Sequence, residues 1–105
     1  MWMKSIDQQL TITNAAASGD TTLVTPGTGQ SVKVHALRLS VAGAVIVTIK
    51  RGSTTLEVFN FAGAGAMPPL ELRQAPYYQT GAAEALVLNA SGAVQVNGRL
   101  EYVVS

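Results

Sequence analysis

The chain has 105 residues, the length of one domain. Charged residues make up only 12% of it, about half the usual fraction, and seven basic residues nearly balance six acidic ones. The basic residues are spread along the chain, which argues against a nucleic-acid partner. No apolar run approaches the ~20 residues of a membrane helix, which argues against a membrane partner. Cysteine is absent, so disulfides and cysteine-based metal sites are excluded.

Short runs rich in Val, Ile, Leu and Thr recur along the chain and end at Gly, Pro, Asn or Ser. Alternating apolar residues in such runs are typical of β-strands, and no stretch keeps the periodicity of a helix. In chain order, the expected strands cover residues 9–13, 21–25, 31–41, 44–51, 54–61, 70–73, 84–90 and 93–104. The segment 62–69 between two of them is expected to cross from one sheet to another.

About eight short strands at this spacing predict an all-β fold, namely an antiparallel β-sandwich, with a jelly roll as one arrangement that fits. The turns at 42–43 and 52–53 are short. We therefore expect the three runs that they join to form a meander.

The run 31–41 changes its parity midway. Val32 and Val34 alternate with polar residues, whereas Leu37 and Leu39 belong to the opposite set. This flip predicts a β-bulge or a bend. In the last run, Gly98 interrupts an apolar set of constant parity, which predicts a bulge or a close backbone approach.

Motifs for catalysis are not found in the sequence. His35 is the only histidine and lies mid-strand, without a Gly-x-Ser-x-Gly motif to accompany it. The six carboxylates are dispersed, and the glycines at 27 and 29 lack the lysine of a phosphate-binding loop. We therefore expect a protein that is not an enzyme, with no catalytic, metal-binding or cofactor-binding residues.

Two groups of residues are candidates for contacts with a partner. Residues 1–8 precede the first strand and are expected to form an N-terminal arm, with the sandwich domain at 9–105. Within the arm, the candidate contact residues are Trp2, Met3, Lys4 and Ile6, because tryptophan is enriched in interfaces. Alternatively, Trp2 folds back over one end of the sandwich. Tyr77 and Tyr78 either stack on a sugar or close one end of the core.

Four segments together carry a resemblance to a known family: 29–39, 52–56, 78–89 and 93–102. The chain resembles small β-sandwich virion proteins of tailed bacteriophages, of the capsid decoration or cement type. The resemblance implies a structural protein on the capsid surface of the virion. It would bind the major capsid protein, stabilise the shell and self-associate, with a homotrimer favoured. The alternative is a receptor- or carbohydrate-binding module of a phage tail or fibre, with Tyr77, Tyr78 and Trp2 as stacking residues.

Overall fold

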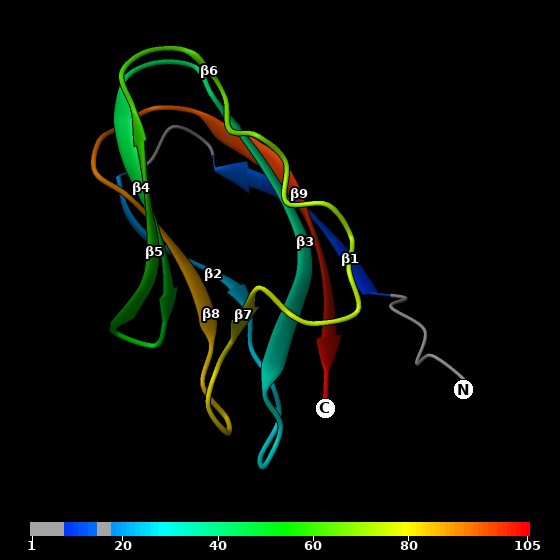
Figure 1. The fold of residues 1–105 in the computed structure, drawn as a ribbon. Helices are drawn as coiled ribbons and strands as arrows, with labels where there is room; N and C mark the ends of the chain where they lie inside the picture. Colours follow the sequence, from blue (N-terminus) through cyan, green and yellow to red (C-terminus); the bar gives the residue numbers. More distant parts are fainter. Residues whose placement is uncertain (1–7, 15–17) are drawn as a thin grey trace.

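The computed structural model describes residues 8–14 and 18–105, and its regular structure is entirely β-strand (Figure 1). This confirms the predicted all-β class. The first strand begins at Gln8, the last residue of the range assigned to the arm. The strands are β1 (Gln8–Asn14), β2 (Gly19–Val24), β3 (Val32–Val41), β4 (Val45–Arg51), β5 (Thr54–Phe61), β6 (Gly65–Ala66), β7 (Tyr78–Gln79), β8 (Leu86–Ala90) and β9 (Val96–Val104).

These strands form two antiparallel sheets that pack face to face. Sheet A has the order β1-β9-β3, and both β6 and β7 pair with the outer edge of β3. Sheet B has the order β2-β8-β4-β5. When β6 and β7 are taken as one broken strand, each sheet has four positions, and this is the strand order of a jelly roll. The predicted β-sandwich is therefore confirmed.

The core lies between the two inner faces and is entirely aliphatic at its centre. Burying each such side chain stabilises the fold by roughly 1.5–3 kcal/mol. The largest fully buried side chains come from both sheets: Val32, Val34, Leu37, Leu39, Val47, Ile49, Leu86, Leu88, Val96 and Leu100. The constant parity expected for the last strand is present, because Val96 and Leu100 both face this core.

The predicted parity change in β3 is a β-bulge. Val34 pairs with Tyr102 and Ala36 pairs with Glu101, so His35 is the extra residue of the ladder. The bulge keeps Val34 and Leu37 on the inner face although they are an odd number of residues apart. His35 is buried, and its Nδ1 lies 2.9 Å from the carbonyl oxygen of Arg73.

The predicted meander is wrong. β4 and β5 form the expected hairpin, with Gly52 at a φ of 55° in the turn, but β3 pairs with β9 and not with β4. The connection 42–44 instead carries the chain from sheet A to sheet B. Alternation shows only that each strand has one buried face. A hairpin and a corner between two sheets both satisfy that condition, so the pattern does not distinguish them.

Between β5 and β8 the chain runs along the free edge of β3, which confirms the expected crossing between sheets (Figure 1). Backbone hydrogen bonds join Met67 to Leu39, Leu70 to Leu37 and Thr80 to Val32. The strand expected at 70–73 is wrong, because only a single bridge forms there, between Leu70 and Leu37. Prolines at 68, 69 and 76 have no N–H to donate, so a regular ladder cannot continue along this edge.

Replacing Gly98 with alanine tests the close approach that the last strand makes to β3. A Cβ atom on Gly98 would lie 1.9 Å from the carbonyl oxygen of Arg38, so the two central strands of sheet A must separate. We expect Gly98→Ala to lower the free energy of unfolding by about 3 kcal/mol, measured by urea denaturation. Gly63→Ala is the control, because nothing lies within 4 Å of a Cβ there. Equal stabilities of the two variants would contradict the assigned packing.

Candidate functional site

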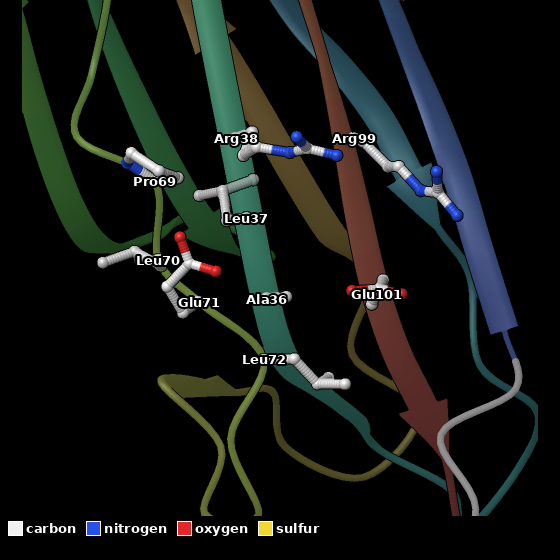
Figure 2. A pocket seen from close by; sticks show the side chains of 9 residues that line it. All are labelled: Ala36, Leu37, Arg38, Pro69, Leu70, Glu71, Leu72, Arg99 and Glu101. Carbon is white, nitrogen blue, oxygen red and sulfur yellow. The ribbon is translucent and has the colours of Figure 1, made fainter.

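Two adjoining cavities lie on the outer face of sheet A, between β3, β9 and the segment 66–72. Figure 2 shows the residues that line the smaller one. Their volumes are about 230 and 480 Å³. Arg38, Pro69 and Arg99 line both, so the cavities form one groove, which we call the sheet A groove. The smaller cavity is further lined by Ala36, Leu37, Leu70, Glu71, Leu72 and Glu101, and the larger by Leu39, Ser40, Ala66, Met67, Asn97 and Gly98.

Two arginines occupy the middle of the groove. Arg38 of β3 and Arg99 of β9 are direct partners in the ladder, and both are exposed on the outer face. Figure 2 shows the Arg38 side chain extending toward β9 and the Arg99 side chain toward β1. Like charges directly opposite in a sheet destabilise it, by up to about 1 kcal/mol. The Arg38 guanidinium has no hydrogen bond or ion pair with any residue that the structure describes.

An apolar wall borders the groove on the side of segment 66–72. The hydrogen bonds that Met67 and Leu70 make with β3 hold this wall in place. Met67 is buried, whereas Leu72 is 52% exposed and is one of the most exposed large apolar side chains. Figure 2 shows Leu72 extending over β3 close to Ala36. The wall therefore offers apolar surface on the β3 side of the groove, and both guanidinium groups extend away from it.

The two ends of the groove differ in charge. At the end of the smaller cavity, Glu71 and Glu101 lie on either side of Ala36 (Figure 2). At the other end the lining is neutral, with Ser40, Asn97 and apolar residues. The groove therefore changes from acidic through basic to neutral and apolar along its length. Such a graded surface can bind a complementary protein segment by ion pairs and apolar contacts.

Both candidate tyrosines have partners within the chain. The Tyr77 hydroxyl donates a hydrogen bond to the Glu71 carbonyl oxygen at 2.8 Å, and the Arg73 guanidinium carbon lies 3.7 Å from the Tyr77 ring centroid. Tyr78 is half-buried against the core, and its hydroxyl donates to a Glu57 carboxylate oxygen at 3.3 Å. Burial, and then the charge of Glu57, raise the pKa of Tyr78 well above its ordinary value. The contacts of Tyr78 suit the interpretation that it closes the core, whereas those of Tyr77 are with Glu71 and Arg73. Sugar stacking stays a prediction.

The candidate arm residues Trp2, Met3, Lys4 and Ile6 lie outside the described residues. Their contact with a partner therefore stays a prediction.

The outer face of sheet B has a polar cluster and an apolar margin. Asp20 accepts hydrogen bonds from Asn89 at 2.7 Å and from Lys50 at 3.2 Å, and these bonds lower the pKa of its carboxyl group. Ile46 and Val58, at the margin formed by β4 and β5, are 43% and 46% exposed. The outer edge of β5 makes no backbone hydrogen bond to any described residue. The cluster joins β2, β8 and β4, whereas the margin is open to a partner.

Sequence reasoning did not identify the sheet A groove. Arg38 and Arg99 are far apart in the chain, and only the register of β3 against β9 places them opposite each other. The alternation in the sequence places Arg38 opposite to the apolar residues of its strand. It does not indicate which strand pairs with that strand. Leu72 and Pro69 belong to an irregular segment, for which no periodic pattern exists.

Within residues 8–14 and 18–105, no group of three or more His, Cys, Asp or Glu side chains is arranged to hold a metal ion. The same residues contain no helix with the length and apolarity to cross a membrane. No protein-family model matches the sequence, and no curated protein matches it either.

Because Arg38 and Arg99 are opposed in the ladder, we expect that removing one of them stabilises the fold. We expect Arg38→Gln to raise the free energy of unfolding by about 0.5 kcal/mol at low salt, because the repulsion from Arg99 is lost. Salt screens exposed charges, so the gain should shrink as ionic strength rises. Urea denaturation at two salt concentrations measures both effects.

Lys33→Gln provides the control for this substitution. Lys33 lies on the same strand, but its ladder partners are Val103 and Gln79, and neither is a cation. A gain of equal size in both variants, or a gain that does not depend on salt, would contradict the repulsion.

Proposed function

We propose that the chain is a structural protein of a bacteriophage virion, of the capsid decoration or cement type. In this proposal it binds the major capsid protein on the outer surface of the shell and stabilises the assembled lattice. It acts by binding and carries out no reaction. The family resemblance of the segments between residues 29 and 102 suggests this function, and the sheet A groove supports it.

The observation that carries the proposal is the combination of side chains in the sheet A groove. Arginine and methionine are enriched in protein–protein interfaces, and arginine is prominent among the residues that contribute most to binding. The groove brings Arg38 and Arg99 together with Met67, Pro69 and the half-exposed Leu72. A protein surface with acidic and apolar groups fits this chemistry.

Capsid stabilisation follows from such binding by mass action. A protein that binds the assembled shell but not its free subunits shifts the equilibrium toward assembly. Each copy contributes only a modest contact area, but the lattice repeats that contact many times. A small sandwich with few charged residues suits this role, because little of its surface is strongly hydrated.

The proposal includes self-association, with a homotrimer favoured. The open edge of β5 supports this part, since unpaired strand edges readily accept another strand. The exposed Ile46 and Val58 add apolar area beside this edge. The tail or fibre module is less well supported, because Arg73 lies over the Tyr77 ring and Tyr78 is half-buried against the core.

Quantitative mass spectrometry of purified virions tests the proposed function. The phage that encodes the chain is purified, and the copies of this chain are counted against those of the major capsid protein. We expect a copy number comparable to that of the major capsid protein, because a decoration protein follows the capsid lattice. A number typical of tail or fibre components, or absence from the virion, would contradict the proposal.

A further inference from the structure

We infer that the sheet A groove binds an extended segment of a partner protein with a basic, an acidic and an apolar residue at alternate positions. This inference rests on the proposed function, because it takes the partner to be a protein. The three positions correspond to the acidic end, the arginine pair and the apolar end of the groove.

The spacing of the groove comes from β3. Three outward residues of β3 follow the groove. Ala36 lines the smaller cavity, Arg38 lines both cavities, and Ser40 lines the larger cavity. Successive outward positions of a strand are about 6.8 Å apart. A partner segment in an extended conformation has the same repeat, so its residues i, i+2 and i+4 reach these three positions.

The central position selects a carboxylate. Arg38 and Arg99 are opposed in the ladder, and Arg38 has no ion pair with a described residue. A carboxylate beside the Arg38 guanidinium, over β9, accepts charge-assisted hydrogen bonds from it and offsets the charge of the opposed pair. Two arginines bordered by apolar residues do not provide the basic stripe that a nucleic acid backbone requires.

The two end positions distinguish a protein segment from a free anion. Glu71 and Glu101 of the smaller cavity attract a basic side chain and repel a phosphate. In the larger cavity, Ala66, Met67, Pro69 and Leu39 offer apolar contacts that an inorganic anion cannot use. Charge complementarity along the groove thus favours a segment of the form basic–x–acidic–x–apolar.

The test is an NMR titration of the full chain, labelled with ¹⁵N, with an acetylated and amidated peptide of sequence Lys-Ser-Asp-Ser-Leu. The reversed sequence is titrated as well. A bound segment can run in either direction along the groove, and the reversed sequence running the opposite way places the same side chains at the same three positions. We expect at least one of the two peptides to shift the amide signals of Arg38, Met67, Leu70 and Gly98. Replacing Asp with Asn in the peptide should weaken binding about tenfold or more, because the ionised acceptor is lost.

Protein variants locate the binding. Arg38→Gln and Arg99→Gln should each lower the affinity for the peptide by about tenfold. Lys33→Gln removes one cation from the same strand outside the groove and should leave the affinity unchanged within about twofold. The dispersion of the amide signals shows in each case that the variant is folded.

Several results would overturn the inference. They are equal binding of the Asp and Asn peptides, an equal loss in Lys33→Gln and Arg38→Gln, shifts confined to other surfaces, and no shift at millimolar peptide. Inorganic phosphate is the second probe, and binding as strong as that of the peptide would identify a site for free anions instead. If the peptides do not bind but the protein is abundant in virions, the proposed role of the groove is rejected and the decoration role is not. If the peptides bind but the protein is absent from virions, the decoration role is rejected and the role of the groove is not.

Discussion

Strand β3 organises the molecule, because it is hydrogen-bonded along both of its edges. One edge forms the ladder with β9, and the other holds the irregular chain between β5 and β8 (Figure 1). The inner face of β3 supplies Val32, Val34, Leu37 and Leu39 to the core. Both the closure of the sandwich and the shape of its outer face therefore depend on this one strand.

The two edges of β3 differ in regularity, and this difference creates the groove. The β9 edge is a continuous ladder interrupted only at His35, so it places Arg38 and Arg99 in register. On the other edge, prolines prevent a regular strand, and the chain contacts β3 only at intervals. Segment 66–72 consequently stands as a wall beside the outer face instead of continuing the sheet. The opposed arginines are expected to lower the stability of sheet A, because like charges directly opposite in a ladder repel each other.

Much of the fold could be predicted from local patterns. Alternation and turn residues located most strands. The change of parity between Val34 and Leu37 predicted a bulge or a bend, and the structure has a bulge at His35. The close approach at Gly98 followed from one glycine in an apolar strand. The pairing of β3 with β9 could not be predicted, because alternation does not specify a partner strand. The groove depends on that pairing and on an aperiodic segment, so its residues could not be grouped from sequence.

We propose that the outer face of sheet A contacts the capsid shell. A cryo-EM reconstruction of the virion of the phage that encodes this chain tests it most directly. We expect density for the sandwich across the capsid lattice, with Arg38, Arg99 and Leu72 facing the major capsid protein. Sandwich density at the tail or fibres, or a capsid-bound sandwich with the outer face of sheet A turned toward solvent, would contradict it.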